Sequence, residues 1–134
     1  MKKSRLKRTR SPKKPKTARQ QLIKANDDLF RILIRARDKV CQKTGKVVNL
    51  QVAHFWRRNI LRTRWDPDNA CLLQGGTHLY WAHSNFQDFT VFWLKRLGQE
   101  RFDRLELKAR YVAPMKEFDL LLIHNDLKKQ VLAL

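Results

Sequence analysis

The sequence predicts a helix-rich α+β fold. Four stretches repeat apolar residues every three or four positions, which is the period of a helix with one buried face. Two short runs of apolar and β-branched residues have instead the length and composition of strands. The chain of 134 residues has room for one small domain and a tail, and not for a large enzyme with a deep substrate cavity.

The chain carries a strong excess of positive charge. Lys and Arg total 30 against 12 Asp and Glu, which gives a formal net charge of +18. Such a surface attracts polyanions and releases their counterions, so nucleic acid is the first partner to expect. Two cysteines and no apolar export segment argue against a disulfide framework, and no run approaches the roughly 18 apolar residues of a membrane span. We therefore expect a cytoplasmic protein that makes no contact with a membrane.

Residues 1–19 are expected to form a disordered basic arm. They include ten Lys or Arg, two Pro and no acidic residue. With almost nothing apolar to bury, this segment cannot offset the entropy lost on ordering. Such a run is typical of a tail that lies along phosphates, although a tail that serves only solubility is the alternative. A single folded domain then covers residues 20–134.

Residues 17–38 should form the first helix, because apolar residues recur at helical spacing along them. Gly45 interrupts this pattern, and the apolar residues between Val47 and Val52 suit a short strand. We place a hairpin across residues 40–55. A second short strand is expected at residues 71–73, followed by a bend at Gly75-Gly76.

A long loop separates these two strands. It covers residues 55–69 and ends in Asp66-Pro67-Asp68-Asn69, which favours a turn. The loop carries four arginines, which are Arg57, Arg58, Arg62 and Arg64. We expect them to bind DNA phosphates, with a merely solvated loop as the alternative. Trp56 and Trp65 flank the loop and suit core packing better than stacking on unpaired bases.

Three helices should complete the domain. The first has Asn85 as N-cap, Asp88 at the capping-box position and Gly98 as the stop. Its expected core stripe consists of Phe86, Phe89, Trp93 and Leu97. A shorter amphipathic helix should surround residues 102–109, and Pro114 should open the last helix. This last helix carries Met115, Phe118, Leu122 and Leu127.

His54, Asn69 and His78 are the candidates for chemistry. Hydrolysis of a phosphodiester needs a base that deprotonates water and a positive group that neutralises the developing charge. His54 follows an apolar strand and precedes the arginine loop, which suits a general base. Asn69 is expected to orient the His54 ring by a hydrogen bond, and His78 to bind a divalent metal. Each residue alone is weak evidence, and the three in this order are much stronger.

The spacing of these three residues resembles that of the HNH endonuclease superfamily. The segments Leu50-Gln51-Val52-Ala53-His54-Phe55 and Thr63-Arg64-Trp65-Asp66-Pro67-Asp68-Asn69 look more narrowly like phage recombination endonucleases of the NinG (Rap) type. The similarity covers roughly residues 20–110. It implies a ββα-metal core with flanking helices, and metal-dependent cleavage of branched or structured DNA during phage recombination. A phage protein would act in the host bacterial cytoplasm.

Two departures from this family affect metal binding. Many relatives hold a structural zinc with two Cys-x-x-Cys knuckles, and here Cys41 and Thr44 occupy the first while Gln74 and Thr77 occupy the second. One thiolate cannot make a closed zinc site, so we predict no structural zinc. Cys71 lies off this spacing and is expected to be a buried small residue.

The second departure concerns the catalytic metal. Many HNH enzymes place a metal-binding Asp or His directly before the base, where this chain has Ala53. His83 is the nearest substitute, although one helical turn would place it four residues after His78 rather than five; a surface histidine is the alternative. Gln51 and Asp68 are weaker candidates. A site made mostly of imidazoles favours Mn²⁺, Ni²⁺ or Zn²⁺ over Mg²⁺.

Three functions compete on this evidence. The first is a DNA endonuclease that uses one divalent metal ion. The second is a non-catalytic DNA-binding module on the same scaffold, which Ala53 and the lost knuckles favour. The third is a small RNA-binding or ribosome-associated protein, which the arm suits but which leaves the histidine spacing unexplained. The last helix could also serve a homodimer.

Overall fold

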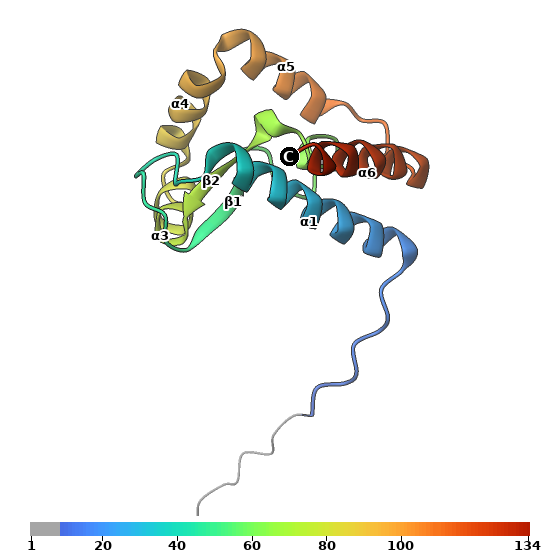
Figure 1. Cartoon of the computed structure of the whole chain (residues 1–134). Coiled ribbons are helices and arrows are strands. Elements are labelled where there is room, and N and C mark those ends of the chain that lie inside the picture. Colours follow the sequence, from blue (N-terminus) through green and yellow to red (C-terminus); the bar gives the residue numbers. More distant parts are fainter. Residues whose placement is uncertain (1–8) are drawn as a thin grey trace, which may run out of the picture.

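The computed structural model describes residues 9–134, and Figure 1 shows how their elements are arranged. The α-helices are α1 (Ala18–Asp38), α2 (Leu61–Arg64), α3 (Gly75–Thr77), α4 (Phe86–Leu97), α5 (Gln99–Arg110) and α6 (Glu117–Leu132). The strands are β1 (Leu50–His54) and β2 (Ala70–Gln74), and two short turns of other helix types are η1 (Pro67–Asn69) and η2 (His78–Ala82). The prediction of a helix-rich α+β fold is confirmed.

The first half of the predicted arm lies outside the described residues. Residues 9–17 are exposed and contain neither helix nor strand, and α1 begins at Ala18. Thr17 and Gln20 cap this end by bonding each other's backbone N–H groups. α1 ends at Asp38, where Lys39 takes a positive φ of 63°. The predicted helix at residues 17–38 is thus confirmed.

The sheet is a single antiparallel pair of β1 with β2, in which Gln51 lies opposite Leu73 and Ala53 opposite Cys71. The hairpin expected within residues 40–55 is wrong, because the partner of β1 comes from the second apolar run, beyond the arginine loop. Val47 and Val48 are 66% and 69% exposed, so their β-branched side chains have no core to pack against. Strand formation depends on such packing more than on intrinsic preference.

The sheet separates two apolar cores. The core on the α4 side consists of Cys41, Ala53, Phe55, Cys71, Leu73, Ala82, Phe89, Trp93, Leu97 and Leu105. The core on the α1 side consists of Phe30, Ile34, Trp65, Ala70, Leu72, Leu120 and Leu127. Each large side chain buried in this way contributes about 1.5–3 kcal/mol. Because neighbouring strand residues point to opposite faces, β1 presents its residues alternately to the two cores.

The last three helices largely follow the sequence pattern. Asn85 accepts the N–H of Asp88 at the start of α4, and Gly98 ends it. Phe86 is 58% exposed, unlike the rest of its stripe, although its ring stacks on Phe55. α6 begins at Glu117, three residues after the expected start at Pro114. It packs beside α1 through Leu120 and Leu127. Among the described residues, no helix is both long and apolar enough to cross a membrane.

Candidate metal and phosphodiester site

The geometry of η2 brings His78 and His83 together. This element is a single π-helical turn, in which the backbone N–H of His83 donates to the carbonyl of His78 at 3.3 Å. A π-turn closes over five residues rather than four, so positions i and i+5 share one side. The two Nε2 atoms lie 3.0 Å apart and the ring centroids 4.7 Å apart. The five-residue spacing therefore joins the two rings instead of separating them.

Gln51 on β1 orients the His78 ring. The Nδ1 atom of His78 lies 3.0 Å from Oε1 of Gln51. Because an amide oxygen can only accept, Nδ1 carries the proton and the Nε2 lone pair faces His83. Burial lowers the pKa of His78, and the neighbouring His83 lowers it further. His78 thus presents a neutral imidazole, which is the form that binds metals.

The distance between the two imidazoles fits a shared divalent ion. Two nitrogens that each lie about 2.1 Å from one ion, at a right angle to each other, are about 3 Å apart. Across residues 9–134, however, no three His, Cys, Asp or Glu side chains gather into a potential metal site. Ala53, where the resemblance leads one to expect an acid or histidine, is fully buried in the core on the α4 side. The pair therefore leaves most of an ion's coordination positions to water or phosphate.

His54 lies at the end of β1 on the opposite face of the sheet from Gln51 and Ala53. Its Nε2 atom is 2.8 Å from the carbonyl oxygen of Arg64, so Nε2 carries the proton and Nδ1 holds the lone pair. Its ring packs against Phe30 at a centroid distance of 6.0 Å. Burial lowers the pKa of His54 to about 4, an effect that the bond to Arg64 opposes only in part. His54 is therefore neutral at pH 7 and able to accept a proton.

A depression of about 250 Å³ lies beside His54. Its lining residues are Asp27, Phe30, Arg31, Arg35, Leu50, Gln51, Val52, His54 and Arg58. Gln51 therefore borders this depression and also contacts His78. The structure brings His78 together with His83 on the side of the sheet that carries Gln51. It places His54 on the other face, against Phe30 and the Arg64 carbonyl. The expected convergence of His54, Asn69 and His78 on one ion is thus not observed.

Asn69 does not make the expected bond to His54. It is fully buried, and its amide donates to the carbonyls of Trp56 and Thr63 at 3.1 and 2.9 Å. Its oxygen accepts the N–H of Trp56 at 2.7 Å. These bonds tie the two sides of the arginine loop together, which holds the Arg64 carbonyl against His54. Asn69 therefore positions His54 through the loop backbone.

We predict that Asn69→Ala destabilises the protein by roughly 3 kcal/mol, because three backbone groups lose their partners in a buried place. Asn59 lies in the same loop, is exposed and makes no side-chain hydrogen bond within residues 9–134. Asn59→Ala is the matched control and should change stability by less than about 0.5 kcal/mol. Urea unfolding followed by tryptophan fluorescence measures both. Equal effects of the two variants would remove Asn69 from its bracing role.

The four loop arginines differ in their surroundings. Asp27 of α1 accepts from Arg64 at 2.6 Å, from Arg58 at 3.0 Å and from the indole of Trp65 at 2.9 Å. Burial raises the pKa of Asp27, and these donors, Arg64 first, lower it overall. The side chain of Arg64 is only 15% exposed, whereas that of Arg58 is 60% exposed. Arg64 therefore mainly braces the loop, while Arg58 retains free surface for a phosphate.

Arg62 and Arg57 complete this comparison. Arg62 donates twice to the carbonyl of Ala113, at 3.1 and 2.9 Å, and its guanidinium lies 4.5 Å from the Tyr111 ring centroid. Arg57 is exposed, and its side chain makes no hydrogen bond or ion pair within the part of the chain that the structure describes. By their contacts, Arg57 and Arg58 suit the predicted phosphate role, and Arg62 and Arg64 suit a structural one.

The remaining candidates have partners elsewhere. Asp68 pairs with Arg101 of α5 and lies away from the two histidines. Trp65 is 6% exposed in the core on the α1 side, and Trp56 packs in part against the other core, in agreement with core packing. Cys71 is fully buried as expected.

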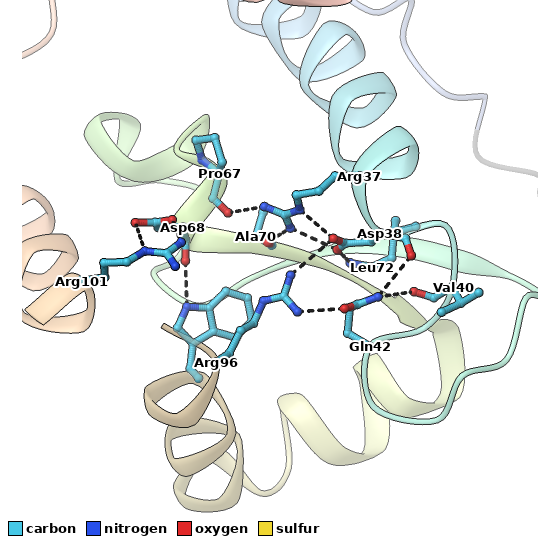
Figure 2. Close-up of polar contacts among 11 residues, drawn as sticks. Arg37, Asp38, Val40, Gln42, Pro67, Asp68, Ala70, Leu72, Arg96 and Arg101 are labelled. Carbon is cyan, nitrogen blue, oxygen red and sulfur yellow. Dashed lines mark hydrogen bonds and ion pairs between the residues drawn. The ribbon is translucent and has the colours of Figure 1, made fainter. Parts of the chain in front are cut away.

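The segments at the two knuckle positions, Cys41 to Thr44 and Gln74 to Thr77, lie next to each other, and Cys41 is the one cysteine among these four positions. Burial raises the pKa of the Cys41 thiol, but hydrogen bonds from Thr44 and from the backbone of Gln74 lower it overall. A polar network beside this loop joins α1, β2 and α4, as Figure 2 shows. Asp38 accepts from Arg37, Arg96 and the N–H of Leu72, and Arg96 also donates to Gln42 at 2.9 Å. These hydrogen bonds hold the loop after α1 in place. This loop corresponds to the first zinc knuckle of the HNH endonucleases that the sequence resembles.

The chain matches no protein-family model, and comparisons with curated proteins and with solved structures find no match either. The site must therefore be interpreted from its own geometry. The sequence analysis assigned no role to Asp27, Arg31 or Arg35, all of α1, because the apolar periodicity of this helix indicated packing. The one available signal was the spacing of Arg31 and Arg35, which at four residues places them on one helix face.

Proposed function

We propose that this protein is a divalent-metal-dependent DNA endonuclease. The observation that carries the proposal is the imidazole pair of η2, whose Nε2 atoms converge to 3.0 Å. A chain with a net charge of +18 has a strong attraction for the DNA backbone. The order of β1, β2 and a short helical segment with His78 agrees with the ββα-metal core that the resemblance to HNH endonucleases implies.

In this proposal His78 and His83 hold the ion. When bound, a divalent ion supplies positive charge that stabilises the phosphate and the departing oxygen. Gln51 accepts a hydrogen bond from Nδ1–H of His78 and so leaves the Nε2 lone pair available to an ion. No second metal and no structural zinc are needed.

His54 is proposed to deprotonate the attacking water. Its Nδ1 lone pair is free because Nε2 is engaged by the Arg64 carbonyl. His54 lines the depression beside α1, which Gln51 also borders, and a DNA strand is proposed to lie there. Arg57 and Arg58 are proposed to hold phosphates there, and Asn69 acts through the loop. Nothing in the site reads base edges, which favours recognition of DNA structure, such as a branch, over sequence.

Cleavage of DNA by the purified full chain tests the proposal. We expect supercoiled plasmid and four-way junctions to be nicked with Mn²⁺ or Ni²⁺ at least as fast as with Mg²⁺, and EDTA to stop the reaction. Strict dependence on Mg²⁺ would contradict an imidazole site, because Mg²⁺ prefers oxygen ligands. Linear duplex and forked DNA in the same assay give the structural preference. A branched substrate should be cut fastest.

The burial of Ala53 favours a second candidate, a DNA-binding module without catalysis. With an apolar methyl group in place of an acidic ligand, the site has only two imidazoles from the chain. This function predicts retardation of DNA on a gel but no nicking with any of the three metals. A preference for RNA in competition at fixed salt would instead indicate an RNA-binding protein.

A further inference from the structure

Two arginines of α1 border the depression beside His54. Arg31 and Arg35 lie one turn apart on the same face of α1 and are both exposed. Both contribute to the lining, together with Arg58 from the loop. Three arginines therefore border one open depression, in a part of the fold where apolar periodicity had indicated packing.

We propose that this surface, defined by Arg31, Arg35 and Arg58, binds the phosphates of one DNA strand beside His54. Each guanidinium has five N–H donors in a planar fork that matches phosphate oxygens. Arg35 uses one nitrogen to donate to the carbonyl of Leu50 at 3.0 Å, which fixes the side chain while leaving other donors free. Arg58 likewise donates to Asp27 through one nitrogen at 3.0 Å. The groups are held in place and still have donors to offer.

Asp28 modulates this surface. It accepts from Lys24 at 2.9 Å and lies 3.5 Å from Arg31, and all three side chains are about half exposed. Exposed pairs of this kind contribute little energy, so a phosphate can displace the carboxylate from Arg31. The same carboxylate repels an approaching phosphate. Removing its charge should therefore strengthen DNA binding, which is the opposite of the effect of removing an arginine.

The same helix face continues toward the arm. Lys24 and Arg35 lie eleven positions apart with Arg31 between them, a distance of about 16 Å along the helix axis. Residues 9–17 leave the start of α1, as Figure 1 shows, and include exposed Lys13, Lys14 and Lys16. One DNA strand can thus lie along the arm, along α1 and into the depression beside His54. The DNA-binding surface is then centred on α1 rather than on the arginine loop alone.

The test measures binding without cleavage, in EDTA, by fluorescence anisotropy of a labelled four-way junction over a range of salt. Arg31→Gln with Arg35→Gln should weaken binding by about tenfold or more at fixed salt. It should also reduce the slope of log K against log salt by about 2, since each lost phosphate contact removes roughly 0.9. Asp28→Asn should tighten binding by about two- to fivefold.

The matched control is Lys95→Gln with Arg104→Gln, which removes two exposed charges from α4 and α5. Equal losses in the control and in the α1 variant would show that only net charge matters and would overturn the proposal. Arg31→Gln alone is the variant least able to disturb folding, because within residues 9–134 the Arg31 side chain has a polar partner only in the exposed Asp28. This single variant should still reduce the slope of log K against log salt by about 1, and an unchanged slope would contradict the proposal.

This inference rests on the proposed function only in taking DNA as the ligand. If the wild type never cuts DNA while the α1 variants bind it more weakly than the control, the surface stands and the endonuclease fails. If cleavage depends on metal but the α1 variants bind and cut normally, the endonuclease stands and the surface fails.

Discussion

Replacing His78 by alanine is expected to abolish metal-dependent nicking, with a loss of about 10³-fold or more in rate. His78 and His83 are the only pair of imidazoles in contact within residues 9–134, and one ring alone cannot hold an ion at a defined place. His83→Ala should have the same effect, because the π-turn presents both rings together. The rate of conversion of supercoiled plasmid at fixed Mn²⁺ measures the loss, and calorimetric titration with Mn²⁺ should show binding to the wild type but not to His78→Ala or His83→Ala.

Two further variants sharpen this result. Gln51→Ala should weaken Mn²⁺ binding by about 10- to 100-fold without abolishing it, because Gln51 orients His78 but is not itself a ligand. His124→Gln is the control histidine, since His124 contacts Asn26 between α1 and α6, far from η2 in the chain. It should bind Mn²⁺ and nick DNA like the wild type. Nicking by His78→Ala at the wild-type rate would place the metal elsewhere.

His54→Ala is expected to slow cleavage by about 10²- to 10⁴-fold, which is the usual contribution of a general base. Binding of Mn²⁺ and of DNA should be unchanged, because His54 contacts neither His78 nor His83. Single-turnover cleavage at saturating Mn²⁺ separates the chemical step from binding. If His54→Ala cleaves as fast as the wild type, water is activated by another group, and the depression serves DNA binding alone.

The pH dependence gives a second test of His54. Its pKa is lowered to about 4 by burial, so the ring remains in its proton-accepting form down to well below pH 6. A histidine with an ordinary pKa near 6.5 loses about fivefold in rate between pH 6.5 and 5.5, because its neutral fraction falls by that factor. At saturating Mn²⁺, cleavage by the wild type should instead lose little of its rate over this interval on account of His54. A fall of about fivefold that is absent in His54→Ala would show that the ring titrates with an ordinary pKa.

The elements that depend on local chemistry could be predicted from the sequence. α1, α4 and α5 appear where apolar periodicity placed them, and Asn85 and Gly98 bound α4 as their capping preferences require. The second strand at residues 71–73 was also predicted, because its residues are apolar throughout. These features involve residues within a few positions of one another. Their sequence signals can therefore be recognised without knowing the contacts with distant parts of the chain, although packing against those parts stabilises them.

The strand pairing could not be predicted in the same way. Val47 and Val48 have the same strand preference as Val52, yet only the run from Leu50 to His54 meets β2. The choice depends on which residues α1 and α4 cover once the chain is folded. Likewise, Phe86 belongs to the apolar stripe of α4 but is exposed, because the core on the α4 side ends before it.

The sequence by itself determined the charge of the molecule, its helices and the presence of His54, Asn69, His78 and His83. Only the tertiary structure decided how these residues meet. The π-turn of η2 brings His78 next to His83. The backbone carbonyl of Arg64, and not Asn69, is the hydrogen-bond partner of His54. Asp27 forms an ion pair with Arg64, so Arg64 is not free to bind a phosphate. Each of these groups could form a hydrogen bond with several different partners, and the sequence does not say which partner it meets. Their pairing follows from burial of the whole chain, because a polar group removed from water must bind the partner that folding places beside it.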